Sequence, residues 1–165
     1  MNHILHLRSL ISGRTFRTDE IDYVDPEYGA DGVVDVVYDY DAIKRDISRE
    51  SLRHNEDCSM WRYKPLLPID SDAEVPPLQI GWTPIYPTPR LAADLGLRHL
   101  WVKDDGRNPT ASFKDRASAI AVVKGRECRA KIITTASTGN AAAALSGICA
   151  SVGQPNVIFV PEKAP

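Results

Sequence analysis

Residues 131–160 constrain the fold more than any other part of the chain, because they carry the pattern of one βαβ unit. Two apolar, β-branched runs flank an alanine-rich stretch, and a short polar turn follows the first run. The predicted parts are a strand at 131–135, a turn at 137–140, a helix at 141–152 ended by Gly153, and a strand at 156–160. About thirty residues suffice for such a unit, so we expect parallel strands with a right-handed crossover.

The turn at 137–140 is the first candidate site, since ligands of open parallel sheets bind beyond the carboxyl ends of the strands. The hydroxyls of Ser137 and Thr138 and the amides of the turn can hold an anion such as a carboxylate. Gly139 lets the backbone approach a ligand without a Cβ in the way. The side-chain amide of Asn140 can hydrogen-bond an aromatic hydroxyl or phenolate. Simple capping of the helix by Ser and Asn is the alternative interpretation.

A second candidate site lies in residues 108–116, where a loop leads into another predicted helix. Ser112 suits the N-cap position, and Asp115 stands three residues later, close to the capping-box pattern. Residues at helical spacing predict the apolar face of this helix. They are Phe113, Ala117, Ile120 and Ala121.

Lys114 falls in the first turn of this helix, at the positive end of the helix dipole, where cations are normally disfavoured. That field, together with the partial burial that we expect, favours the neutral and nucleophilic form of the amine. A neutral lysine amine forms a Schiff base with an aldehyde. An ordinary surface lysine beside a capped helix is the alternative. An amine, an anion-binding turn and a side-chain amide together are what pyridoxal phosphate chemistry requires.

The motifs at these two sites carry a family resemblance. Asn-Pro-Thr-Ala-Ser-Phe-Lys-Asp-Arg at 108–116, followed by Thr-Ala-Ser-Thr-Gly-Asn-Ala-Ala-Ala-Ala at 135–144, resembles the fold-type-II pyridoxal-phosphate enzymes. Within that group the likeness is greatest to the threonine synthases. The segments Gly-Trp-Thr-Pro at 81–84 and Met-Trp-Arg-Tyr-Lys-Pro-Leu-Leu-Pro at 60–68 are similar to the same family.

The resemblance implies a role for each candidate residue. Lys114 would bind the aldehyde of pyridoxal 5'-phosphate and later carry a proton, and Asn140 would hydrogen-bond the ring oxygen of the cofactor. Ser137 and Thr138, with the amide of Gly139, would hold the substrate carboxylate. The implied enzyme is a carbon–oxygen lyase acting on phosphates, and it converts O-phospho-L-homoserine and water into L-threonine and phosphate.

The resemblance also implies an α/β fold, with a parallel sheet and flanking helices like those of fold-type-II enzymes, here incomplete. We expect residues 1–40 to form a small, degenerate zinc-ribbon-like β segment and residues 41–80 a helical and extended connection. Residues 81–165 would form the N-terminal part of the cofactor-binding fold. Many relatives begin with a ribbon of two CxxC pairs, but the matching positions here are Ser9, Ser12, Asp25 and Tyr28. No thiolate remains at these positions, so we expect no metal and a segment held by packing.

Shorter patterns predict the remaining elements. Strands are expected at 4–7, 33–38 and 98–103, a helix with Asp41 as its cap follows residue 41, and another helix runs from Arg90 to Gly96. The family continues after a parallel strand with a Gly-rich loop for the cofactor phosphate, and no GxGxxG or GGGxG pattern occurs among the 165 residues. We therefore expect an N-terminal fragment, a split subunit or a truncated reading frame, with little activity alone. A second copy or a complementing C-terminal chain would then be its partner.

The composition of the chain argues against nucleic-acid and membrane partners and against secretion. Twenty basic and 22 acidic residues give a formal charge of −2, which does not favour nucleic acid. No apolar run has the length of a membrane span, and residues 1–10 are too polar for a secretory signal. Cys58, Cys128 and Cys149 are odd in number and far apart, as in a reducing cytosol, so a cytoplasmic location is expected.

Three alternatives stay open. The cofactor could serve another reaction of the same fold type, such as that of threonine dehydratase or cysteate synthase. The chain could instead be a non-catalytic protein that keeps the motifs and binds a partner through an uncovered sheet. A role in binding the substrate phosphate is open for Lys103 and Arg116, although such residues are more often solvated or salt-bridged.

Overall fold

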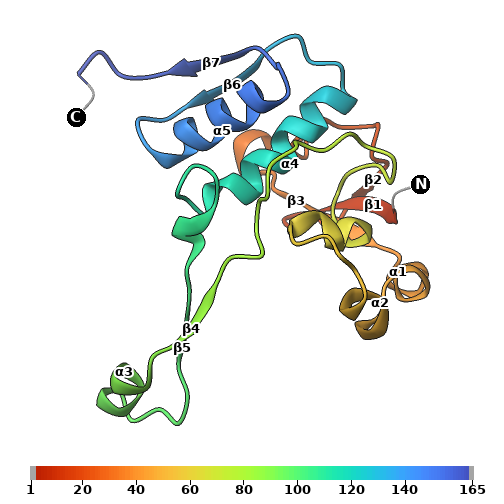
Figure 1. Ribbon diagram of the computed structural model, residues 1–165. Helices are drawn as coiled ribbons and strands as arrows, with labels where there is room; N and C mark the ends of the chain where they lie inside the picture. The colour runs from red at the N-terminus through yellow and green to blue at the C-terminus, as the bar shows by residue number, and fades with distance from the viewer. Residues whose placement is uncertain (1–2, 164–165) are drawn as a thin grey trace. The chain divides into compact units, whose positions relative to one another are not determined.

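The computed structural model describes residues 3–163, which contain two compact units (Figure 1). Among the described residues, the first unit comprises 3–55 and 63–72, and the second comprises 56–62 and 73–163. The strands are β1 (Ile4–Ser9), β2 (Thr15–Phe16), β3 (Val34–Tyr38), β4 (Ile85–Pro87), β5 (Trp101–Lys103), β6 (Ile133–Ala136) and β7 (Asn156–Phe159). The α-helices are α1 (Tyr40–Asp46), α2 (Arg49–Arg53), α3 (Pro89–Asp94), α4 (Lys114–Glu127) and α5 (Asn140–Ser151), and the 3-10 helices are η1 (Gly29–Asp31), η2 (Met60–Leu66) and η3 (Asp105–Arg107).

The first unit is built on an antiparallel sheet with the strand order β2-β1-β3. The strands predicted at 4–7 and 33–38 are confirmed, with ends shifted by one or two residues. The predicted cap of the next helix is wrong by two residues, because the side chain of Asp39, not Asp41, accepts a hydrogen bond from the amide of Ala42 at 2.9 Å. The buried apolar side chains of this unit are Phe16, Ile43 and Ile69.

In the second unit, β4 and β5 form a two-stranded antiparallel ribbon, with α3 in the connection between them. The helix predicted at 90–96 is confirmed, and Gly96 follows it with a φ of +66°. The strand predicted at 98–103 is shorter than expected, since only its last three residues pair with β4.

The βαβ unit is confirmed. β6 and β7 are parallel, with Ile133 opposite Asn156 and Ala136 opposite Phe159, and α5 connects them. Gly153 has a φ of +65° just after α5, a conformation that favours glycine at the end of a helix. The predicted order of strand, turn, helix and strand is therefore present, with boundaries shifted by one or two residues.

Helices α4 and α5 pack against each other beside this small sheet (Figure 1). The predicted apolar face of α4 is wrong: the side chain of Phe113 is 60% exposed, and Ala117 and Ala121 are also exposed. The buried side chains of α4 lie on a different side of the helix, which includes a carboxylate. They are Asp115, Ala119, Val122 and Val123, and those of α5 are Ala144, Leu145, Ile148 and Cys149.

The two helices run in the same direction. Arg126, in the last turn of α4, donates a hydrogen bond to the carbonyl of Val152, just after α5, at 3.1 Å. Counting back twelve residues from each partner reaches Lys114 and Asn140, the first residues of the two helices. Figure 1 shows the helices side by side. The starts of α4 and α5 therefore lie at the same end of the pair.

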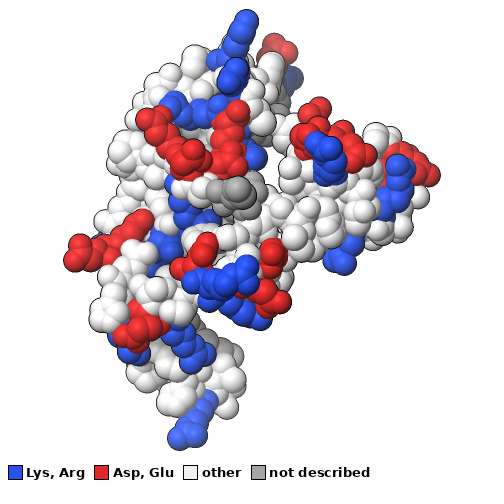
Figure 2. All heavy atoms as spheres, turned by 90° about the vertical axis from the view of Figure 1, so that its right-hand side faces the viewer, with Lys and Arg blue, Asp and Glu red and all other residues white. Residues whose placement is uncertain are grey.

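The surface carries both signs of charge. Figure 2 shows Lys and Arg side chains interspersed with Asp and Glu over the face that it displays, in keeping with the near balance of the composition. Across residues 3–163, no helix combines the length and the apolar character that a membrane crossing demands.

Candidate active site

The helix that carries Lys114 begins one residue later than predicted. The hydroxyl of Ser112 accepts a hydrogen bond from the amide of Lys114 at 3.1 Å, so Ser112 does satisfy an amide of the first turn. The capping-box prediction is wrong, because the carboxylate of Asp115 does not turn back to Ser112. It accepts hydrogen bonds from the amide of Thr110, at 2.8 Å, and from the hydroxyl of Thr110.

The amine of Lys114 is accessible. The prediction that this residue is partly buried is wrong, because Lys114 is exposed to solvent. Its Nζ lies 4.9 Å from the centroid of the Phe113 ring, and it forms no ion pair with any residue among 3–163. The side chain is exposed because the buried face of α4 begins with the next residue, Asp115.

The turn before α5 has open space around it. Ser137 is half-buried and its amide donates to the carbonyl of Phe159 at 3.1 Å, while its hydroxyl accepts from the amide of Gly139 at 3.2 Å. A Cβ added to Gly139 would meet no atom within 4 Å. Thr138 and Asn140 are exposed, and no side chain caps the first turn of α5. The first amides of this helix therefore keep their capacity to bind a ligand.

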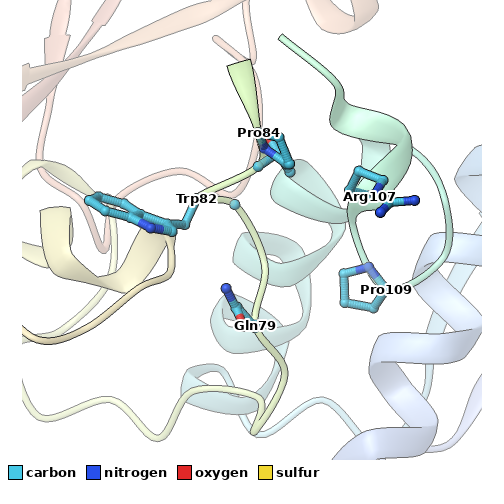
Figure 3. Close-up of a pocket in the computed structure, with 7 residues that line it drawn as sticks. Gln79, Trp82, Pro84, Arg107 and Pro109 are labelled. Atoms are coloured by element: carbon cyan, nitrogen blue, oxygen red, sulfur yellow. The ribbon is translucent and has the colours of Figure 1, made fainter. Parts of the chain in front are cut away.

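The structure brings the two predicted sites to one end of the α4–α5 pair. That end holds Lys114 with its free amine and Asn140 with its side-chain amide, beside the turn at 137–140. Neither residue lines the cavity of about 360 Å³ that Figure 3 shows beside the loop at 107–109. Its lining residues are Gln79, Gly81, Trp82, Thr83, Pro84, Arg107 and Pro109.

A network next to the Lys114 turn was not predicted. The guanidinium of Arg116 binds the carboxylate of Asp105, which also accepts a hydrogen bond from the hydroxyl of Thr83 at 2.6 Å. The hydrogen bonds from Arg116, followed by that from Thr83, lower the pKa of Asp105 from 3.8 to about 2. Arg116 is thus salt-bridged, and the amine of Lys103 donates to the carbonyl of Thr83. Thr83 lies 22 residues from Asp105 and 20 residues from Lys103 in the sequence, so no local pattern predicts the network.

Ser9, Ser12 and Asp25, three of the four positions at which a zinc ribbon would carry thiolates, form a polar group in the first unit, here called the Asp25 cluster. The hydroxyl of Ser12 donates to the carboxylate of Asp25 at 2.9 Å, and the hydroxyl of Ser9 accepts from the amide of Ser12 at 3.2 Å. Burial raises the pKa of Asp25, but hydrogen bonds from Ser9, the Glu27 amide and Ser12 together hold it below its usual value. Within residues 3–163, no group of three or more His, Cys, Asp or Glu side chains is placed to hold a metal ion.

Comparison with known proteins places these motifs in a family. A family model described as "Pyridoxal-phosphate dependent enzyme" matches residues 77–165. The threonine synthase of Methanocaldococcus jannaschii is 37% identical over 155 residues, which cover 94% of this chain and 37% of that protein. The threonine synthase of Methanosarcina acetivorans is 40% identical over 156 residues, with the same two coverages. The cysteate synthase of Methanocella paludicola is 31% identical over 112 residues, which cover 64% of this chain and 25% of that protein.

The chain spans 37% of the length of each of these two threonine synthases. The segment that matches the family model is more than half of the chain, and it contains both α4 and α5 with the turn between β6 and α5. On this evidence the chain belongs to the pyridoxal-phosphate dependent enzyme family.

Proposed function

We propose that this chain is the N-terminal part of a threonine synthase-like enzyme, which converts O-phospho-L-homoserine and water into L-threonine and phosphate. One observation carries the proposal: the free amine of Lys114 and the turn that ends in Asn140 lie at the same end of two parallel helices. The likeness to two threonine synthases over 94% of the chain supports the choice of substrate.

The residues at this end fit pyridoxal 5'-phosphate chemically. The cofactor needs an accessible amine for its aldehyde, and the exposed amine of Lys114 has no competing ion pair among residues 3–163. It also needs a partner for its ring oxygen, and the exposed side chain of Asn140 is such a partner. When bound, the cofactor supplies an electron sink for the substrate carbon that loses a proton.

Each residue then has a distinct task. Lys114 would hold the aldehyde group of the cofactor through its Nζ, and the same atom would carry a proton at the substrate carbon. Asn140 would orient the ring. The hydroxyls of Ser137 and Thr138 and the amide of Gly139 bind the substrate carboxylate, helped by the positive end of α5. The open space around Gly139 supports close approach of that carboxylate.

The finer architecture belongs to the same proposal. We propose that residues 81–165 form the N-terminal part of a fold-type-II catalytic domain, that residues 41–80 connect to it, and that residues 1–40 are a ribbon remnant without metal. The Asp25 cluster, at the positions that correspond to the lost thiolates, supports the last point. We propose that the partner of this chain is either another copy of it or a complementing C-terminal chain. The wide spacing of the cysteines supports a cytosolic site of action.

Borohydride reduction in the presence of pyridoxal 5'-phosphate, followed by peptide mapping, tests the proposal. We expect one dominant pyridoxyl group on Lys114, and its loss in Lys114→Ala. Lys124→Ala is the matched control, because this lysine lies in the same helix and pairs with Glu127 instead. Equal labelling of all exposed lysines would reject the proposed site.

A cysteate synthase-like reaction is the second candidate, because cysteate synthases match 64% of the chain. Adding phosphohomoserine, or phosphoserine together with sulfite, to the chain combined with the C-terminal part of a relative separates the two reactions. Threonine release from the first substrate supports the proposed function, and turnover of only the second supports the cysteate synthase-like reaction. Turnover of threonine alone would indicate a dehydratase. A chain that takes up no cofactor but forms a tight heteromer would be a non-catalytic binding protein.

A further inference from the structure

A buried carboxylate directly follows Lys114 and has no task in the proposed reaction. Asp115 is 0% exposed, and both of its carboxylate oxygens accept hydrogen bonds from one residue. Oδ2 accepts from the amide of Thr110 at 2.8 Å, and Oδ1 accepts from the hydroxyl of Thr110. A buried carboxylate is costly unless it is well bonded, so these two bonds fix the loop to the first turn of α4.

The same threonine also contacts α5. A Cβ added to Gly147 would lie 2.9 Å from the Cγ2 methyl of Thr110, a distance that requires one of the two to move. Glycine at 147 therefore lets the loop lie against the middle of α5. Thr110 is held on one side by α4 and on the other by α5.

The loop that presents Thr110 is strained. Ala111 has a φ of +57°, in the left-handed region that is unfavourable for a residue with a Cβ. Such a conformation persists only where its surroundings hold it, and it occurs often at functional sites. Here the surroundings include the bond from the Ala111 amide to the carbonyl of Asn108 at 2.8 Å. The Asn108 side chain in turn accepts from the amide of Gly81 at 2.8 Å.

We propose that Asp115, Thr110 and Gly147 form a clamp that sets the position of Lys114 relative to Asn140. The inference rests on the proposed function and adds positioning residues to it. Asp115 adjoins Lys114 in the chain, so the bonds of its carboxylate to Thr110 hold the helical turn that carries the lysine. Through the methyl of Thr110, the same contact fixes the start of α4 against the helix that Asn140 begins. In this proposal Asp115 acts through Lys114 and is therefore a positioning residue.

Matched variants separate the hydrogen bond from the packing contact. Thr110→Val removes the hydroxyl and keeps a methyl at the place of Cγ2, whereas Thr110→Ser keeps the hydroxyl and removes the methyl. Asp115→Asn removes the charge. Thr88→Val is the control, because it removes a comparable hydroxyl bond, to the carbonyl of Leu100 at 3.1 Å, elsewhere in the same unit.

The first measurement is the share of pyridoxyl label on Lys114 relative to all other lysines after borohydride reduction. We expect this share to fall about tenfold in Thr110→Val and Asp115→Asn, to fall about threefold in Thr110→Ser, which loses only the methyl contact with Gly147, and to be unchanged in Thr88→Val. A merely structural role would lower thermal stability in Thr88→Val and Thr110→Val alike without this selective loss. Wild-type selectivity in folded Thr110→Val and Asp115→Asn would overturn the clamp.

The second measurement needs no cofactor and separates failure of the clamp from failure of the proposed function. Spin labels are placed on the exposed first turns through Ala117→Cys and Ala143→Cys, with Cys58→Ser and Cys128→Ser removing the exposed native thiols. We expect one narrow distance distribution with wild-type Thr110 and with Thr88→Val, and a broader one with Thr110→Val and Asp115→Asn. Equal widths would overturn the clamp even if Lys114 is labelled. Broadening without any preference for Lys114 would support the clamp and reject the proposed cofactor site.

Discussion

Arg116 and Asp105 form a two-point ion pair, with Nε donating to Oδ2 at 3.0 Å and the NH2 nitrogen donating to Oδ1 at 2.9 Å. The pair joins the first turn of α4 to η3. Arg116 lies two residues after Lys114 in this turn. A planar guanidinium matches a carboxylate in this way and an ammonium does not, so Arg116→Lys is expected to weaken the pair.

The pair predicts a dependence of stability on pH. Because the pKa of Asp105 is lowered from 3.8 to about 2, its ionised form stabilises the folded chain above about pH 4, and this contribution disappears as the pH falls towards 2. Asp105→Asn should lower the free energy of unfolding by about 1 kcal/mol at neutral pH, a value reduced for partial exposure. Urea unfolding at several pH values measures this. A wild-type advantage that stays constant from pH 6 to about pH 2 would contradict the prediction.

Two glycines differ sharply in their tolerance of a side chain. Gly81 has a φ of +85°, and an added Cβ would lie 2.8 Å from the NH1 nitrogen of Arg116 and 3.1 Å from the amide nitrogen of Met60. Gly81→Ala should therefore lower the free energy of unfolding by about 2 kcal/mol or more. Gly139→Ala, where the space is open, should change it by less than about 0.5 kcal/mol. Thermal unfolding of both variants tests the contrast, which fails if the two are equally stable.

The buried face of α4 can be checked by truncation. Val122 is 0% exposed, so Val122→Ala should lower the free energy of unfolding by about 1–3 kcal/mol through lost burial and a residual cavity. Phe113 is 60% exposed, and Phe113→Ala should cost less than about 1 kcal/mol. Denaturant titration of the two variants measures both losses in the free energy of unfolding. A larger loss for Phe113→Ala than for Val122→Ala would support the apolar face that helical spacing alone predicts.

The Asp25 cluster predicts an acid-sensitive first unit that does not depend on zinc. Since hydrogen bonds hold the pKa of Asp25 below its usual value, ionised Asp25 stabilises this unit above that usual pKa and ceases to do so as the pH falls. Asp25→Asn should lower the melting temperature at neutral pH and reduce its fall in acid. Asp19→Asn, at an exposed carboxylate paired with Arg17, should change little. Calorimetry with and without added Zn²⁺ or a chelator should give the same curves for wild type.

The βαβ unit could be predicted because its signals are local. Its strands are β-branched runs, Gly153 marks the end of the helix, and thirty residues allow only one simple connection between parallel strands. The buried face of α4 could not be predicted in the same way. Alanines at 117, 119 and 121 make several sides of this helix apolar, and packing against α5 decides which side is buried.

In the candidate site, too, the features set by neighbouring residues could be predicted and those set by tertiary contacts could not. Lys114 and the turn at 137–140 could be placed from neighbouring residues alone, including their positions at the starts of helices. Asp115 fitted a capping box by spacing, but the amide and hydroxyl of Thr110 lie close enough to take its carboxylate instead. The pairing of Arg116 with Asp105, and of β4 with β5, depends on how distant segments meet, and no local pattern contains that information.

The shared direction of α4 and α5 has an electrostatic consequence at each end. Antiparallel neighbours largely cancel each other's fields, but two helices pointing the same way add theirs, so the leading end carries a combined partial charge of roughly one positive elementary unit. The C-terminal ends of the two helices both carry partial negative charge and would repel each other. Arg126 lies there, in the last turn of α4, and donates to the carbonyl just beyond α5. Arg126 thus opposes the field at the C-terminal end of both helices, and Asp115, the acidic residue in the first turn of α4, opposes the field at the N-terminal end.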